Sequence, residues 1–163
     1  MKFIRLLSIA LFIMTGFIAG CSTTETTGTG TADTAQPKAG MSVQQASLYQ
    51  RLGEKPAITA VVDEFVARVA ADSRINARFA NTNIPRLKMN LVDQICAASG
   101  GPCTYTGRDM KTTHAGMRIT NADFDALVGD LVAALNKFKV PEREKNELLS
   151  VLGPMRKDIV ETP

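Results

Sequence analysis

The chain of 163 residues has no tryptophan, only one histidine, three cysteines and a formal charge of just +3. A single histidine excludes zinc sites built from several imidazoles, and it leaves His114 as the only imidazole available as a base or ligand. A charge of +3 is too small for a protein dedicated to nucleic-acid phosphates, which would carry a basic stripe. An odd number of cysteines means that one of them has a role outside any pair.

The first 20 residues have the composition of a secretory signal peptide. Lys2 and Arg5 precede an apolar run over residues 6–18, which is too short for a stable membrane span. The run ends in Ile18-Ala19-Gly20-Cys21, which resembles the bacterial lipobox, where an aliphatic and two small residues precede a lipidated cysteine. Alternatives are an uncleaved anchor, or a secretory signal followed by a chance cysteine. Because Cys21 directly follows the apolar run, we expect cleavage after residue 20 and lipidation of Cys21.

Residues 21–46 are rich in threonine, glycine and alanine and contain nothing that can form a core. Such a composition is typical of a flexible tether, which would hold a domain over residues 47–163 away from the lipid surface. Ser22 is not the aspartate that resembles an inner-membrane retention signal. We therefore expect a membrane-anchored protein that faces the periplasm, with the outer membrane favoured.

From Ser47 onward, apolar residues recur at three- and four-residue steps, which predicts an all-α domain. The expected helices cover residues 47–52, 56–72, 84–98, 110–114 and the stretch from a capping motif at Thr120 to Phe138. A last helix begins at Pro141 and is kinked by Pro154. No segment shows the alternation of a strand.

The segment Gly100–His114 contains Gly-Gly-Pro-x-x-Tyr-x-Gly and then Met-Lys-x-x-His, with Gly116 two residues further on. These motifs resemble the group 1 truncated haemoglobins. The resemblance runs from Ser47 to about Val160 and includes the Phe-containing stretch Arg78–Asn83. It implies a two-over-two helical globin fold around haem b.

The same resemblance implies roles for individual residues. His114 becomes the proximal ligand of the haem iron, with one imidazole nitrogen on the metal and the other donating to a nearby carbonyl. Phe79 is expected to stack on the porphyrin. The remaining pocket residues, each equally explicable as ordinary core, are Met110, Ile119, Phe124 and Leu127. The candidates for pairing with haem propionates, which are as explicable as a solvated face, are Arg86, Lys88 and Lys111.

The sequence departs from the family on the distal side, where the gas would bind. Oxygen-binding members of the family usually place a tyrosine beside the position of Phe65 and often a glutamine in the next helix, but this chain has Val66 and Leu91. Leu87 is expected to face the ligand as well, and none of these three side chains can donate a hydrogen bond. Such a bond to a partly charged acceptor contributes about 1.5–3 kcal/mol, so its loss predicts roughly ten- to a hundredfold faster oxygen release. Carbon monoxide gathers less charge and should be affected much less.

Cys96 and Cys103 are seven positions apart on either side of the Gly-Gly-Pro turn. Outside the cytoplasm we expect them to form a structural disulfide. Two buried free thiols or a redox-active pair are the alternatives.

The leading interpretation is a lipid-anchored haem globin that binds a diatomic gas such as O2, NO or CO. The alternative is a haem electron-transfer protein with an unknown redox partner and Lys88 or Met89 as an internal ligand. A peroxidase would need a distal acid or base, and none is apparent. A haem-free globin-shaped interaction module is a third reading, against which the presence of His114 argues.

Overall fold

The computed structural model of the chain describes residues 45–162. The predicted signal peptide, Cys21 and the tether up to residue 44 lie outside the described residues. None of the helices between residues 45 and 162 combines the length and the apolar character that crossing a membrane requires.

The regular secondary structure of the described residues consists of helices joined by loops. Its helices are α1 (Leu48–Arg51), α2 (Glu54–Ala71), η1 (Asn76–Phe79), α3 (Ile84–Ala98), α4 (Met110–His114), α5 (Asn121–Lys137), α6 (Glu142–Leu152), η2 (Gly153–Met155) and α7 (Arg156–Ile159). The only β-type pairing within residues 45–162 is an isolated bridge between Thr120 and Thr162. The predicted all-α class is confirmed.

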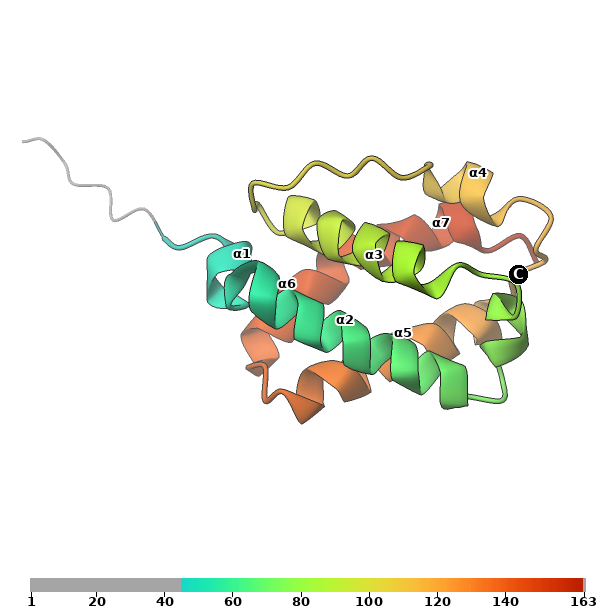
Figure 1. Cartoon of the computed structure of the whole chain (residues 1–163), viewed down its shortest axis with the longest axis horizontal. Helices are drawn as coiled ribbons and strands as arrows, with labels where there is room; N and C mark the ends of the chain where they lie inside the picture. The colour runs from blue at the N-terminus through green and yellow to red at the C-terminus, as the bar shows by residue number, and fades with distance from the viewer. Residues whose placement is uncertain (1–44, 163) are drawn as a thin grey trace, which may run out of the picture. The chain divides into compact units, whose positions relative to one another are not determined.

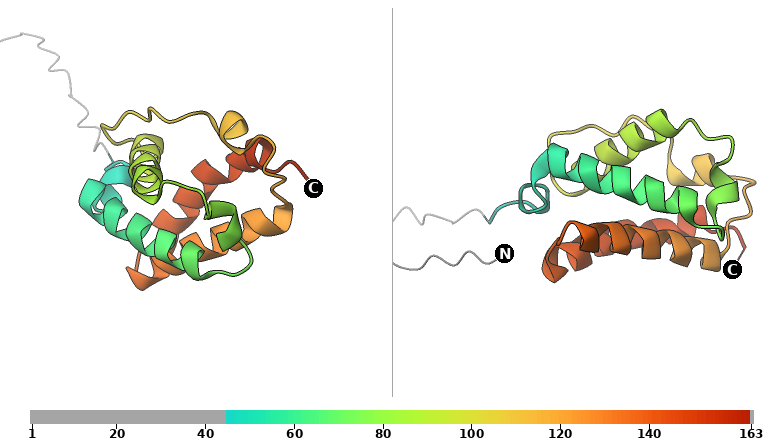
Figure 2. Two further views of the ribbon diagram at one scale, coloured as in Figure 1. Left: turned by 45° about the vertical axis from the view of Figure 1, so that its right-hand side comes forward. Right: turned by 60° about the horizontal axis from the view of Figure 1, so that its bottom comes forward.

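The helices form two layers of two. α2 packs on α3 to make one layer, while α5 and the C-terminal helices make the other (Figure 1). The right-hand view of Figure 2 shows the α2–α3 layer above the α5–α6 layer. The short helix α4 lies against α7, at the far end of the domain from α1.

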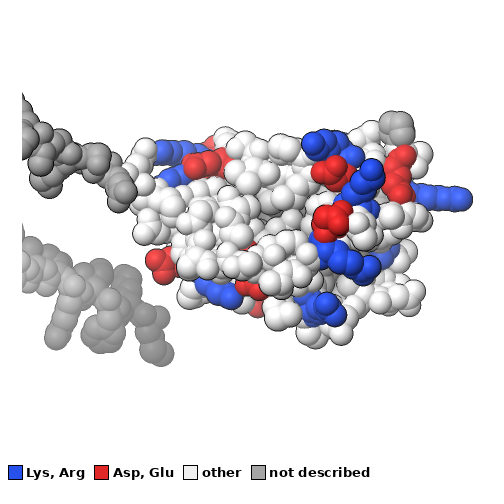
Figure 3. All heavy atoms as spheres, turned by 90° about the horizontal axis from the view of Figure 1, so that it is seen from above, with Lys and Arg blue, Asp and Glu red and all other residues white. Residues whose placement is uncertain are grey.

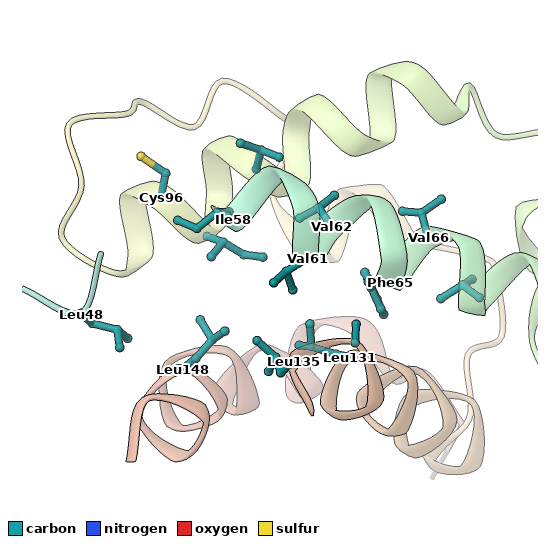
Figure 4. Close-up of a cluster of buried hydrophobic side chains, with 14 of the residues drawn as sticks. Leu48, Ile58, Val61, Val62, Phe65, Val66, Cys96, Leu131, Leu135 and Leu148 are labelled. Carbon is teal, nitrogen blue, oxygen red and sulfur yellow. The ribbon is translucent and has the colours of Figure 1, made fainter. Parts of the chain in front are cut away.

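The main core forms on α2, which has apolar residues on two adjoining faces. Figure 4 shows Val62 and Val66 pointing toward α3, and Val61 and Phe65 pointing toward α5. All four side chains are at most 7% exposed. Burying an aliphatic or aromatic side chain of this size contributes about 1.5–3 kcal/mol, so this helix holds both layers together.

Helix starts follow local side-chain chemistry in most places. Ser47 and Thr120 both form capping boxes, as the motif at Thr120 predicts. The expected start of α2 at Pro56 is wrong, because the helix begins at Glu54, directly after Gly53 in the left-handed conformation (φ +90°). Pro56 lies in the first turn, where its missing N–H has no helical acceptor to lose.

The expected last helix is interrupted rather than kinked. α6 ends at Leu152, Pro154 lies in the 3-10 turn η2, and α7 follows. Phe138, which we expected on the apolar stripe of α5, instead follows the last residue of that helix and is 44% exposed. A residue beyond the end of a helix leaves the periodic face, which explains this error.

The loop between α3 and α4 is attached to the end of α3. The structure joins Cys96 and Cys103 as a disulfide, with Sγ atoms 1.99 Å apart and Cα atoms 5.7 Å apart. Gly101 lies between them, and a Cβ atom at that position would come within 2.7 Å of the Cys96 Sγ and 2.6 Å of the Tyr49 ring. A glycine is therefore required in this turn.

The disulfide generates a stability prediction. Closing a loop of this length should raise the free energy of unfolding by about 2.5 kcal/mol, because the cross-link restricts the unfolded chain. Denaturant unfolding with and without reductant measures the difference. The double variant C96S/C103S is the control and should be insensitive to reductant. Mass spectrometry that finds both thiols free in protein isolated from cells would contradict the predicted pairing.

Candidate functional site

The only imidazole of the chain lies at the end of α4, where His114 is the last helical residue. Its Nδ1 lies 2.8 Å from the carbonyl oxygen of Met110, and the side chain is half-buried. A proton on Nδ1 satisfies this contact, which leaves the lone pair of Nε2 free to bind a metal. The carbonyl also restricts rotation of the ring, so the imidazole has a defined direction.

The start of α4 is held by its own cap. The Asp109 carboxylate accepts a hydrogen bond of 2.8 Å from the backbone N–H of Thr112. This backbone hydrogen bond lowers the pKa of Asp109, because it stabilises the charged carboxylate. A helix of five residues needs such a cap, since it is far too short to be stable by itself.

Two separate apolar clusters lie within the described residues. The main cluster joins α1, α2, α3, α5 and α6, and it includes Val66, with Phe79, Leu91 and Leu127 packed against it. The second cluster consists of Ile119, Phe124 and Ile159, with half-buried neighbours packed against them; these are Met110, Met117, Val128, Met155 and Val160.

The predicted pocket residues are divided between these clusters. Val66, Phe79, Leu91 and Leu127 belong with the main cluster, whereas Met110, Ile119 and Phe124 belong with the second. Leu87 is half-buried on α3. The helix that carries His114 contributes to the second cluster through Met110, whereas Val66 and Leu91 belong with the main cluster. That they lie on the two sides of one haem pocket stays a prediction.

The predicted propionate partners do not share one environment. Arg86 and Lys111 are exposed, whereas the Lys88 ammonium group lies 2.8 Å from the Asp63 carboxylate. Met89, the other candidate for an internal ligand, is 57% exposed. Contacts of Arg86 and Lys111 with propionates stay predictions, and Lys88 would first have to leave its ion pair.

Sequence reasoning missed Gln94. Its side-chain Nε2 lies 3.3 Å from the sulfur of Met155 and 3.8 Å from that of Met110, so its amide group lies between α3, α4 and η2. Gln94 comes three residues after Leu91 and seven after Leu87, which places all three on one face of α3. The helical spacing was therefore a signal that could have identified it.

Arg78 and Asp123 form a second group that sequence reasoning missed. Arg78 donates to the Asp123 carboxylate at 3.0 Å and to the carbonyl oxygen of Met117 at 2.6 Å. The backbone N–H of Thr120 donates to the same carboxylate, and this bond, with a smaller contribution from Arg78, lowers the pKa of Asp123. These contacts join η1, which contains Phe79, to the start of α5. They were not predictable, because partners 39 and 45 positions apart share no local pattern.

Charged side chains are unevenly distributed over the face seen in Figure 3. Lysine, arginine, aspartate and glutamate gather mainly at the end of the domain where α4 lies, and the middle of this face is largely uncharged. Charges of both signs are mixed at that end. The segment that carries His114 is therefore bordered by polar groups.

The residues present fit a haem group. Within residues 45–162, no three histidine, cysteine, aspartate or glutamate side chains gather as a metal-binding set. One imidazole would suffice as the protein ligand where a macrocycle such as a porphyrin supplied the remaining nitrogen ligands. A half-buried imidazole with a free Nε2, on a helix that packs against an apolar cluster, suits such an apolar group.

Comparison with known proteins supports this interpretation. The bacterial-like globin family matches residues 47–161. Over 116 residues, the chain is 39% identical to a group 1 truncated haemoglobin of Mycolicibacterium paratuberculosis. The aligned region covers 71% of this chain and 85% of that relative.

Solved structures agree with the sequence comparison. The truncated haemoglobin of Tetrahymena pyriformis in its Fe(III) form has a TM-score of 0.68 and 33% identity, covering 71% of this chain and 98% of that one. The 2/2 haemoglobin of a Synechococcus species, in the cyanomet state with covalently attached haem, has a TM-score of 0.67 and 31% identity, with the same coverage. The chain belongs to the bacterial-like globin family as a truncated haemoglobin, and its cofactor is haem.

Proposed function

We propose that the domain holds haem b through Nε2 of His114 and binds a diatomic gas on an apolar distal side. We further propose that lipid on Cys21 anchors the chain to a membrane outside the cytoplasm. The observation that carries the haem proposal is the contact of His114 Nδ1 with the Met110 carbonyl oxygen, because it leaves Nε2 free for a metal.

Bound haem supplies an iron that can take a gas such as O2, NO or CO. The chain contributes the imidazole, and the Met110 carbonyl fixes its ring orientation and raises its basicity. The Met110 side chain packs against the second apolar cluster. Met110 thus restrains His114 through its backbone carbonyl while its side chain attaches α4 to that cluster.

On the proposed distal side, the chain offers apolar contact without a donor. Val66 is 7% exposed, and Leu87 and Leu91 are half-buried on α3. A gas that gathers negative charge would receive no hydrogen bond from these three residues, whereas an uncharged gas would lose little. The Nε2 of Gln94, the neighbouring polar group on this face of α3, is directed to the sulfur atoms of Met155 and Met110. This supports weak O2 retention.

Two observations favour an external gas over the electron-transfer alternative. The Lys88 ammonium group is occupied by its ion pair with Asp63, and Met89 is 57% exposed. Neither side chain is therefore available as an internal ligand without rearrangement. We propose that the distal side is left to a small external ligand.

The membrane proposal is supported by the sequence of the first 46 residues. The basic start, the apolar run, Cys21 and the polar tether occur in the order expected of a bacterial lipoprotein. Two or more acyl chains would give stable anchoring. The pairing of Cys96 with Cys103 suits an oxidising compartment, which agrees with a periplasmic location.

The haem proposal predicts a spectrum that depends on His114. The purified chain should take up haem and show, when reduced, an absorption band that shifts with carbon monoxide. H114A should lose this spectrum or recover it only with added imidazole, because the ligand nitrogen is removed. T113A changes the exposed neighbouring residue and serves as the control. An unchanged spectrum in H114A would refute the ligand assignment, and the absence of haem uptake by the wild type would refute the function.

The distal proposal predicts a gain of oxygen retention when a donor is introduced. L91Q or V66Y should slow O2 dissociation by about ten- to a hundredfold, because a hydrogen bond to a charged acceptor becomes possible. CO dissociation should change much less. L91M keeps the volume without a donor and should resemble the wild type. Stopped-flow measurement of O2 release tests this, and equal rates in L91Q and L91M would contradict it.

The membrane proposal predicts lipid incorporation at one residue. Cells that express the full chain with labelled palmitate should label the wild type but not C21A, because the thiol that accepts the lipid is absent. S22A retains the thiol and should be labelled. Gel electrophoresis of membrane fractions gives the result. Labelling of C21A would show that the lipid is attached elsewhere, and absence of label from the wild type would refute the anchor.

A further inference from the structure

The turn that follows His114 has an unusual backbone. Gly116 has φ +79° and Arg118 has φ +53°, so two left-handed residues occur two positions apart. Arginine rarely adopts this conformation, because its Cβ approaches the neighbouring carbonyl. The turn therefore needs contacts from other parts of the chain to persist.

Glu161 provides such contacts from the C-terminal segment. Its Oε1 accepts a hydrogen bond of 2.6 Å from the N–H of Gly116, and its Oε2 accepts one of 2.6 Å from the N–H of Arg118. These two backbone hydrogen bonds lower the pKa of Glu161, which shows that they favour the charged carboxylate. A single carboxylate thus binds both left-handed residues.

The backbone of Glu161 is attached to the same turn. The N–H groups of Glu161 and Thr162 both donate to the carbonyl oxygen of Ile119, at 3.0 and 3.2 Å. Ile159, two residues before Glu161, is buried in the second apolar cluster. Burial of Ile159 therefore fixes the C-terminal segment, and the Glu161 carboxylate extends from this fixed segment to the turn.

The opposite side of the turn is held by Arg78. Its Nη1 donates to the carbonyl oxygen of Met117 at 2.6 Å, and the N–H of Met117 donates to the carbonyl oxygen of His114 at 3.0 Å. The turn, which begins at His114, is consequently held between η1 and the C-terminal segment. A change in this turn would be transmitted directly to the end of α4.

We propose that Glu161 is a positioning residue for His114, holding the turn at residues 116–118 so that the imidazole keeps one orientation toward the haem iron. The proposal rests on the proposed function of His114. The hydrogen bonds of the Glu161 carboxylate go to the backbone of the turn and its charge also interacts with His114, so E161Q, which removes the charge and keeps one acceptor, separates the two effects.

The experiment compares E161A and E161Q with E142Q in the full chain. E161A removes both acceptors, whereas E161Q retains one oxygen and guards against complete unfolding. Glu142 is the matched control, because it is a 73% exposed glutamate paired with Lys145 at the start of α6. Amide hydrogen exchange of the haem-free protein is the first readout. Exchange at Gly116 and Arg118 should accelerate about tenfold or more in E161A and less in E161Q, since opening of the turn becomes easier.

The second readout uses the haem-loaded ferrous protein. The iron–histidine stretching band in the resonance Raman spectrum should shift or broaden in E161A, and haem transfer to an excess of an apoglobin acceptor should be about tenfold faster. Both effects should be smaller in E161Q and absent in E142Q. A merely structural role would lower the unfolding temperature and leave the iron–histidine band of the folded protein unchanged.

The outcomes separate the two proposals. An unchanged band in haem-loaded E161A would overturn the positioning role and leave the proposed haem function intact. Failure of the wild type to load haem would overturn the proposed function and the positioning role with it. In that case, exchange at Gly116 and Arg118 would still decide whether Glu161 holds the turn. Unchanged exchange in E161A would refute that contact as well.

Discussion

Packing of α2 against both α3 and α5 is the interaction on which the remaining structure depends. Val62 and Val66 face α3, whereas Val61 and Phe65 face α5, so one helix sets the separation of the two layers (Figure 4). α3 supplies the proposed distal residues, and α5 supplies Leu127 and Phe124. Because closely packed helices shift together, the position of α2 sets the positions of the proposed distal residues on α3 and of Leu127 and Phe124 on α5.

The proposed metal ligand, His114, lies on a helix that depends on its surroundings for stability. α4 has five residues and cannot be stable alone, so its geometry comes from its surroundings. Asp109 caps its beginning, and the turn after His114 is held by Arg78 and Glu161. Pre-organisation of this kind places a ligand without requiring a long helix. The disulfide also restrains the loop between α3 and α4, because it attaches Cys103 to the end of α3.

The proposed distal residues and the surroundings of α4 differ in polarity. Val66 and Leu91 belong with the main apolar cluster, and neither side chain carries a hydrogen-bond donor. Charged groups gather near α4, where their contacts are to backbone atoms and to one another. These polar contacts hold the turn that follows His114.

The sequence by itself determined the helices and the family. The predicted bounds of α3 and α4 agree with the structure, because Pro85 near the start of one helix, the Gly-Gly-Pro turn after it and the Asp109 cap are local signals. The resemblance to the truncated haemoglobins also implied that one nitrogen of His114 bonds a nearby carbonyl, and Nδ1 lies 2.8 Å from the Met110 carbonyl oxygen. The predictions for the start of α2 and for the helix around Pro154 were less accurate. The backbone conformation at Gly53 and in η2 sets these boundaries, and apolar periodicity does not report it.

Only the tertiary structure decided which residues meet. The amide of Gln94 contacts the sulfur of Met155, 61 positions away, and Glu161 reaches Gly116 across 45 positions. Neither contact has a local pattern, because each depends on how the buried faces of separate helices bring their ends together. Helix propensity and capping act over a few neighbouring residues, whereas the turn after His114 is held by chain segments that only folding brings side by side.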